Sequence, residues 1–269
     1  MTETTEAPAE KEAEHDDGAM TIWEHLDELR SRLVKALLAA VLGAGIGWYF
    51  RKSMFMFLAQ PLKDAWDPAK YGPFEIHFRA LGEGFVMYLK IAILGGFVMA
   101  FPLIVYQIWA FVAPGLYKKE KKYSILFVLS SCGLFMMGSY FSWRFAFPVA
   151  AEYLLSYAGK DPDLPGVEIK ATLMITEYIG FITKMLMAFG IIFELPVVVL
   201  FLSVAGLVNH THLIKFFRYF IVIAFVIAAI LTPPDPLSQI MMAVPLMLLY
   251  GISIGVAWLF GRKKSPSND

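Results

Sequence analysis

The sequence is poor in charge, in cysteine and in recognisable catalytic motifs. Charged residues make up 17% of its 269 residues, compared with about 25% in soluble domains. Hydrophobic residues make up 58%, and the mean hydropathy is +0.60. The 23 basic and 23 acidic residues cancel, so there is no excess of positive charge for binding nucleic acid. The composition predicts an integral membrane protein without a nucleic-acid partner.

A single cysteine, Cys132, excludes an intrachain disulfide and any metal site built on cysteine pairs. The sequence contains neither a G-x-x-x-x-G-K-[ST] loop nor an HExxH motif. GISIG, at Gly251–Gly255, matches G-x-S-x-G, but all five histidines lie outside the long apolar runs and none is placed to act as its base. We interpret these residues as a G-x-x-x-G helix-packing face. We therefore expect no enzymatic activity, no cofactor and no metal site.

Residues 1–18 are acidic and rich in alanine and proline, whereas a secretory signal begins with basic residues. We expect residues 1–20 to form a disordered acidic cytoplasmic tail, residues 21–260 a six-span membrane domain, and residues 261–269 a basic cytoplasmic tail. On this interpretation the first apolar run is retained as a membrane anchor.

Six apolar runs serve as predicted membrane spans, each of which ideally needs roughly 20 residues. They are Leu33–Phe50, Gly84–Ala113, Tyr123–Pro148, Tyr178–Val208, Tyr219–Thr232 and Pro236–Phe260. Short segments dense in Lys and Arg share the side of the termini, and the longer, more acidic loops 51–82 and 149–177 lie opposite. The positive-inside rule then places both termini in the cytoplasm. We predict an all-α fold with six transmembrane helices.

The fifth run is short, because its 14 uncharged residues would cover about 21 Å of a ~30 Å hydrocarbon core. It either takes in Lys215–Phe217 by snorkelling or lies in a locally thinner bilayer. Prolines interrupt spans two, four and six, at Pro102, Pro196 and Pro245. Because prolines bend helices, we expect a curved bundle with a concave face and short fifth and sixth spans.

Charged residues at membrane depth are costly and point to function. Glu194, in AFGIIFELPVVV, is the clearest; the alternative is a protonated carboxyl that is hydrogen-bonded to a neighbouring helix. Lys90 and Lys184 lie at similar depths in spans two and four, each preceded by a glutamate. We interpret these two lysines as paired or snorkelling side chains.

Two carboxylates stand among basic residues on the cytoplasmic side. Glu28 lies in EHLDELRSRL and Glu120 in LYKKEKKY. By spacing alone each is a solvated charge, and Glu28 with Arg32 forms an ordinary i,i+4 pair. The spacing therefore leaves a functional role open.

Four segments resemble the TatC family, the receptor subunits of the twin-arginine protein translocase. They are HLDELRSRL before span one, YQIWAFVAPGLYKKEKK after span two, AFGIIFELPV in span four and LTPPDPLSQ at the last hairpin. The resemblance runs from about residue 20 to 260, in the family's order and topology.

The resemblance implies a receptor for twin-arginine signal peptides that exports folded precursor proteins by means of the proton-motive force. The implied signal-binding residues are Glu28, Arg30, Arg32, Leu33, Phe111 and Glu120. Two separated carboxylates suit the recognition of two guanidinium groups. The resemblance also implies a cavity role for Glu194 and Pro61, and contacts to partner helices by Thr232, Asp235 and Gln239.

The implied partners are the single-span subunits TatA and TatB, signal peptides and membrane lipid, in an oligomeric TatBC-type complex. The implied location is a bacterial-type cytoplasmic (inner) membrane. The main alternative is an ion-coupled solute permease that uses Glu194, Lys90 and Lys184 as a relay; a third, an intramembrane hydrolase, lacks a histidine in any span. Because the recognisable motifs gather at the cytoplasmic face rather than at the midplane, we favour the receptor.

Overall fold

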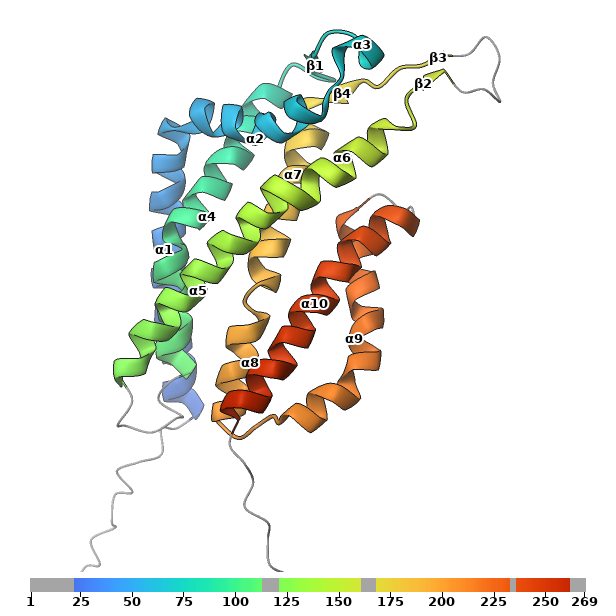
Figure 1. The fold of residues 1–269 in the computed structure, drawn as a ribbon. Coiled ribbons are helices and arrows are strands. Elements are labelled where there is room, and N and C mark those ends of the chain that lie inside the picture. Colours follow the sequence, from blue (N-terminus) through green and yellow to red (C-terminus); the bar gives the residue numbers. More distant parts are fainter. Residues whose placement is uncertain (1–21, 113–120, 161–167, 233–235, 262–269) are drawn as a thin grey trace, which may run out of the picture.

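The computed structural model describes residues 22–112, 121–160, 168–232 and 236–261. The long helices are α1 (Ile22–Tyr49), α4 (Glu83–Val112), α5 (Lys121–Phe141), α7 (Ile175–Ile192), α9 (His210–Leu231) and α10 (Pro236–Phe260). Shorter helical segments are α2 (Arg51–Ala65), α3 (Pro68–Tyr71), the π-helical turn η2 (Ser142–Ala146), α6 (Phe147–Leu155) and α8 (Leu195–Val204). Figure 1 shows them as one elongated helical bundle.

The length and hydropathy of these helices give five membrane spans, and a sixth when the bent α1–α2 pair is counted, in agreement with the six predicted. Five stretches qualify alone: Glu83–Phe111, Ile125–Leu155, Ile175–Val204, His210–Leu231 and Gln239–Phe260. α1 and α2, bent by 82° relative to each other, supply the sixth as one broken span. The last two stretches have 22 residues each, whereas the preceding three have 29, 31 and 30, so the fifth and sixth spans are the shorter ones. The fifth is nevertheless longer than the 14 residues predicted, because α9 begins at His210. The protein is a multi-pass membrane protein.

The all-α prediction needs one small correction. Four two-residue strands lie at the end of the bundle that carries α2 and α3, which we call the strand end (Figure 1). β1 (Ile76–His77) pairs in parallel with β4 (Leu173–Met174), and β2 (Gly159–Lys160) pairs antiparallel with β3 (Glu168–Ile169). The two predicted loops, 51–82 and 149–177, are therefore tied together by backbone hydrogen bonds.

Several helix boundaries differ from the predicted ones. α1 begins at Ile22, so EHLDELRSRL belongs to the same helix as the first predicted span, Leu33–Phe50, instead of preceding it. The third span reaches Leu155 through η2 and α6. Pro148 did not end it, because Pro148 falls in the first turn of α6, where the missing amide is tolerated.

Prolines interrupt one span only among the described residues. α4 and α10 run unbroken across Pro102 and Pro245. The fourth span breaks between α7 and α8, at Phe193 and Glu194 just before Pro196. The break falls at the position of the intramembrane carboxylate, because a proline at the start of α8 cannot donate the backbone bond that continues a helix.

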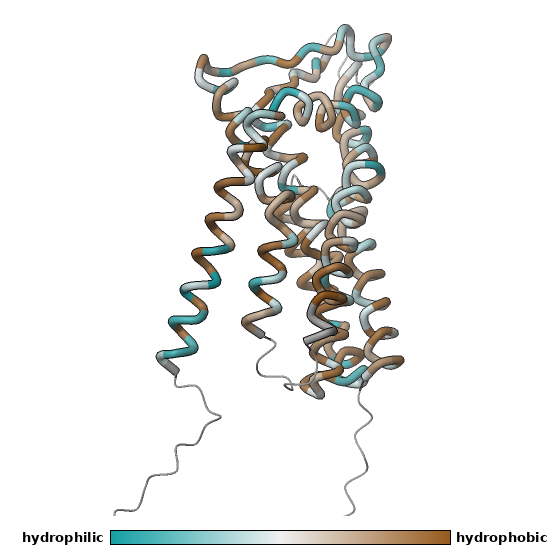
Figure 2. Tube along the Cα trace, turned by 90° about the vertical axis from the view of Figure 1, so that its left-hand side faces the viewer, coloured by the Kyte–Doolittle hydropathy of each residue, from teal (hydrophilic) through white to brown (hydrophobic). Residues whose placement is uncertain are grey.

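The packed core is centred on α7. Its Ile179, Ile182, Met185 and Phe189 are fully buried, and α5, α4 and α9 pack around it. Figure 2 shows hydrophobic residues along the middle of the bundle and hydrophilic residues gathered in the first turns of α1. We call this second polar region the Glu28 end.

Candidate functional site

The Glu28 end is positioned by an unusually close contact between α1 and α4. A Cβ atom on Gly43 would lie 2.6 Å from the carbonyl oxygen of Gly96, and one on Gly47 would lie 2.6 Å from that of Ala92. Only glycine permits this approach, because a side chain would meet backbone atoms that cannot move aside. The helices run antiparallel, so the first turns of α1 lie beside the last turns of α4.

Glu28 and Arg32 form the predicted i,i+4 pair on the face of α1 that meets α4. Arg32 donates to Glu28 Oε1 from Nε at 2.9 Å and from Nη2 at 2.5 Å. A third donor, Arg32 Nη1, reaches the side-chain oxygen of Gln107 on α4 at 3.5 Å. The side chains of Glu28 and Arg32 are only 21% and 23% exposed, so this pair is worth more than a fully solvated one.

The pair leaves one carboxylate oxygen unused. Both guanidinium nitrogens bind Oε1, and Oε2 is buried with no hydrogen-bond partner among the described residues. His25 Nδ1 lies 3.9 Å from Oε2, which is beyond hydrogen-bond range. A buried acceptor without a donor costs free energy, so Oε2 is a favourable position for an incoming N–H donor.

An aromatic pair stands beside this oxygen. The rings of His25 on α1 and Phe111 on α4 are stacked, with centroids 4.4 Å apart and 16° between their planes. The His25 side chain is half exposed. The pair therefore forms a flat, partly open surface next to Glu28.

The other predicted signal-binding residues are placed differently. Arg30 is exposed and lies about 200° around α1 from Glu28, on the opposite face of the helix. Leu33 is 65% exposed, and so are Trp23 and Leu26, at 78% and 49%. Glu120 lies outside the described residues. The structure thus brings Glu28, Arg32 and Phe111 together and leaves Arg30 and Leu33 on accessible faces.

Glu194 lies at the break between α7 and α8. Its backbone stays hydrogen-bonded: its N–H donates to the carbonyl of Ile191, and its carbonyl accepts from the N–H of Val198. Ser131 of α5 is within reach of the carboxyl group, but Oε1 is buried without a partner among the described residues. As at Glu28, one oxygen of an enclosed carboxyl group is left to be satisfied.

The lysines of the alternative relay do not gather around Glu194. Lys184 is exposed and precedes Glu194 by ten residues, which corresponds to about 15 Å along a helix. Lys90 lies beside Gly180, more than one further turn away from Glu194. Of the two glutamates that precede these lysines, Glu177 pairs with Arg79 and Glu83 accepts the backbone N–H of Arg79. The contacts therefore give no continuous chain of ionisable groups for a permease.

Comparison with known proteins identifies the family. Residues 24–245 match the family model described as Sec-independent protein translocase protein (TatC). The TatC of Desulforapulum autotrophicum is 41% identical over 91% of this chain and 87% of its own length. The TatC of Aquifex aeolicus is 40% identical over 91% and 98%.

The chain belongs to the TatC family. A solved structure titled as the twin-arginine translocase receptor TatC in DDM has a TM-score of 0.76 and 39% sequence identity. The match covers 87% of this chain and 99% of that one. The curated relatives are named as translocase proteins, and the TatC fold is a six-span membrane fold, as described above.

The structure describes three of the four residues to which the resemblance gave a cavity or partner role at the last hairpin and in the first loop. Thr232 caps α9 and donates its hydroxyl to the carbonyl of Ala228 at 2.9 Å, so its polar group is satisfied within its own helix. Gln239 is half-buried in α10, and Asp235 lies outside the described residues. Pro61 is buried inside α2, a helix that we had predicted as loop.

The packing face predicted at GISIG is wrong for this chain in isolation. A Cβ atom on Gly251 or Gly255 would have no neighbouring atom within 4 Å among the described residues. The motif that packs is GAGIG at 43–47, against Gly96 of α4. Sequence reasoning also missed His25 and Gln107, although His25 lies one turn before Glu28 and Gln107 falls within the TatC-like segment YQIWAF.

Proposed function

We propose that this chain is the signal-peptide receptor subunit of a twin-arginine translocase. The observation that carries the proposal is the unpaired, buried Oε2 of Glu28 beside the His25–Phe111 pair. A guanidinium group of the signal satisfies this oxygen and lies flat against the aromatic pair, as arginine does on aromatic faces. Lysine offers neither the planar fork nor the stacking, so the site favours arginine.

Arg32 has a supporting role in this arrangement. It holds Oε1 and fixes the carboxylate rotamer, while Gln107 restrains the guanidinium of Arg32 from α4. The incoming arginine then binds an oriented acceptor, which reduces the conformational entropy lost on binding. Glu120 supplies the carboxylate for the second arginine. Arg30 holds the N-terminal end of α1 at the cytoplasmic surface.

The apolar part of the signal follows the exposed hydrophobic residues of α1. Leu33 follows Glu28 along α1, and Trp23 and Leu26 precede it; all three side chains are exposed. In this orientation the Glu28 end faces the cytoplasm and both termini lie inside, in the cytoplasmic membrane of a bacterial-type cell. No catalytic step is required of this subunit, because transport draws on the proton-motive force.

Partner subunits complete the translocase. Thr232, Asp235 and Gln239 at the α9–α10 hairpin contact the single-span helices of TatA and TatB in an oligomeric complex, and the folded precursor crosses with their help. Glu194 organises the intramembrane cavity through its unsatisfied carboxyl oxygen. Pro61 supports the same cavity from α2.

The test is photo-crosslinking of a twin-arginine signal peptide to membranes that contain this chain. We expect strong crosslinking of the Arg-Arg peptide, weak crosslinking of its Lys-Lys version, and loss of the difference in the Glu28→Ala Glu120→Ala double variant. A double variant that still separated the two peptides as the native chain does would refute the assignment of these carboxylates.

A further inference from the structure

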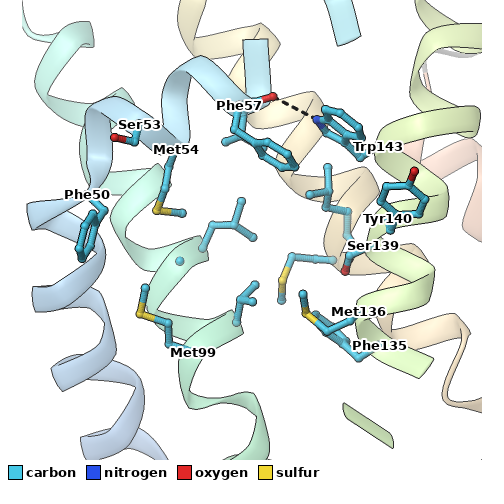
Figure 3. Close-up of a pocket in the computed structure, with 16 residues that line it drawn as sticks. Phe50, Ser53, Met54, Phe57, Met99, Phe135, Met136, Ser139, Tyr140 and Trp143 are labelled. Carbon is cyan, nitrogen blue, oxygen red and sulfur yellow. Dashed lines mark hydrogen bonds between the residues drawn. The ribbon is translucent and has the colours of Figure 1, made fainter. Parts of the chain in front are cut away.

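A hollow of about 610 Å³ opens on the side of the bundle under α2. Figure 3 shows the side chains of α2 facing those of α5 across this hollow, with α4 behind. The interior is closed by buried side chains such as Leu58, Leu94 and Phe135, at 2%, 5% and 0% exposure. The mouth is formed by Phe50, Met99 and Met136, which are roughly half exposed. It is therefore an open apolar groove.

Four methionines line this groove: Met54, Met99, Met136 and Met187. Their unbranched thioether side chains adapt to flexible apolar ligands. Gly95 makes room for one of them, because a Cβ atom there would lie 2.5 Å from the terminal methyl of Met54. The hydroxyl of Ser139, which also lines the groove, already donates to the carbonyl of Leu186 at 3.3 Å. The groove thus offers shape and dispersion contacts rather than hydrogen bonds.

The strand end of the groove is shut by a contact between α2 and η2. The rings of Phe57 and Trp143 are stacked with centroids 4.6 Å apart, and Trp143 Nε1 donates to the carbonyl of Phe57 at 3.1 Å (Figure 3). A helix with its side chains is about 10–12 Å wide, so a spanning helix cannot pass this closure. A single extended hydrocarbon chain that ends beneath α2 fits the groove.

Three cations are adjacent in the chain to residues that line the groove, two at its mouth and one at its closed end. Arg51 and Lys52 begin α2 next to Phe50, and Arg144 follows Trp143 on η2. The Arg51 guanidinium donates to the carbonyl of Trp48 and lies over its ring, which fixes its charge at the bend between α1 and α2. No carboxylate forms an ion pair with these three cations within the described ranges. An anionic headgroup is complementary to this rim.

From these observations we propose that the groove is a binding site for an anionic diacyl phospholipid. One acyl chain lies among the four methionines, and its end stops at the Phe57–Trp143 closure. The phosphate lies beside Arg51 and Lys52. The bound lipid fills the space between α2 and α5, so that the bend of α2 over the bundle is supported from below. This site is separate from the Glu28 end and does not depend on the proposed signal binding.

The experiment uses the full chain in phosphatidylcholine vesicles with a trace of phosphatidylglycerol that carries a diazirine at the middle of one acyl chain. After illumination, labelled peptides are mapped by mass spectrometry. We expect labelling of Met54, Met99 and Met136 to exceed clearly that of Leu37 and Ile230, which are exposed apolar residues of α1 and α9. Equal labelling of the groove and of these two residues would overturn the proposal.

Matched variants test the groove itself. Met136→Trp fills it from α5, whereas Met137→Trp alters the neighbouring residue, which is similarly exposed and does not line the groove. We expect groove labelling to be lost in the first variant and kept in the second. Gly95→Leu fills the groove from α4, with Gly251→Leu on open surface as its control. Groove labelling that survives a folded filling variant contradicts the proposal.

The charge of the headgroup is tested by Lys52→Gln and by the same diazirine on phosphatidylcholine. Loss of one cation near an anionic lipid should reduce labelling by the phosphatidylglycerol probe about fivefold, with labelling by the phosphatidylcholine probe unchanged. Equal groove labelling by both probes in the native chain would refute the anionic assignment. A photoreactive residue at position 136 that captures a protein instead of lipid would identify a partner subunit as the occupant.

Discussion

At the strand end, Glu177 in the first turn of α7 is paired with Arg79, which precedes α4. At the opposite end, Glu28 binds Arg32 through one oxygen, and the other is buried without a partner among the described residues. The Arg79–Glu177 pair is exposed, at 64% and 66%, and lies next to the β1–β4 pairing. Its charges are satisfied by the chain itself. Those of Glu28 are satisfied only in part, although this site is far less exposed.

The two regions also differ in how they are held. The strand end is tied by backbone pairing and by side chains that bond across elements, as Tyr178 does to the carbonyl of Leu58. The Glu28 end depends on the glycine contact between α1 and α4. The comparison teaches that polar groups which all have partners within the chain, as at the strand end, stabilise the fold. A polar group that lacks a partner but is held in place by rigid helices, as Glu28 is, is suited to binding a ligand.

The largest effect is expected from Gly96→Ala, which breaks the support of the Glu28 end. The new Cβ atom would lie 2.5 Å from the Cα atom of Ala44, so α1 and α4 must separate. We expect a cost of about 3 kcal/mol in stability, seen as a lower thermal transition in detergent, together with loss of signal-peptide crosslinking.

Gly45→Ala is the matched control for Gly96→Ala. Gly45 has open space at the Cβ position, and alanine is favoured over glycine in a helix by roughly 1 kcal/mol. This variant should be at least as stable as the native chain. Equal thermal transitions for the two variants would show that the close contact does not hold the helices together.

Glu194→Gln tests whether Glu194 has a role different from that of Glu28, the other carboxyl group with a buried unpaired oxygen among the described residues. Interactions with a charged group are worth about 1.5–3 kcal/mol, so we expect transport to fall about tenfold or more. Signal-peptide binding should stay unchanged, because the Glu28 contacts involve α1 and α4 only. Transport is measured as protected precursor in vesicles. Equal loss of binding and transport would argue against a separate role for Glu194.

Glu28→Gln and Glu177→Gln test the comparison of the two ends directly. Each exchange keeps the side-chain shape and removes one charge. We expect the Glu28 variant to bind an Arg-Arg signal peptide about tenfold more weakly, as measured by titration of a labelled peptide. The Glu177 variant should bind as the native chain does. A similar loss in both variants would indicate a general electrostatic effect rather than a site.

The smallest effect is expected from His25→Ala, which removes half of the aromatic pair. Since an aromatic contact is worth about 0.5–1.5 kcal/mol, binding should weaken about threefold. His25→Phe keeps a ring over Phe111 and should retain native affinity in the same titration. If the phenylalanine variant is as weak as the alanine variant, the imidazole acts through Glu28 and not through stacking.

Much of the fold follows from local sequence. Apolar run lengths gave six spans, and the double proline at 233–234 predicted the separation between α9 and α10, because both depend on residues close together in the chain. The Glu28–Arg32 pair was predictable for the same reason, since four residues bring two side chains onto one face of a helix. The α2 bend was missed because α2 is a moderately polar helix without a long apolar run.

The sequence by itself determined that this is a six-span protein of the TatC pattern with carboxylates at both membrane surfaces. Tertiary structure alone decided at which of two G-x-x-x-G motifs the glycines pack: those of GAGIG at 43–47 meet α4, while Gly251 and Gly255 of GISIG face open space among the described residues. It also decided how the Glu28 carboxylate is held, because Arg32, which donates to Oε1, donates in turn to the side-chain oxygen of Gln107 on α4. Helical periodicity places side chains on a face, but the partner of that face is fixed by packing between segments far apart in the chain.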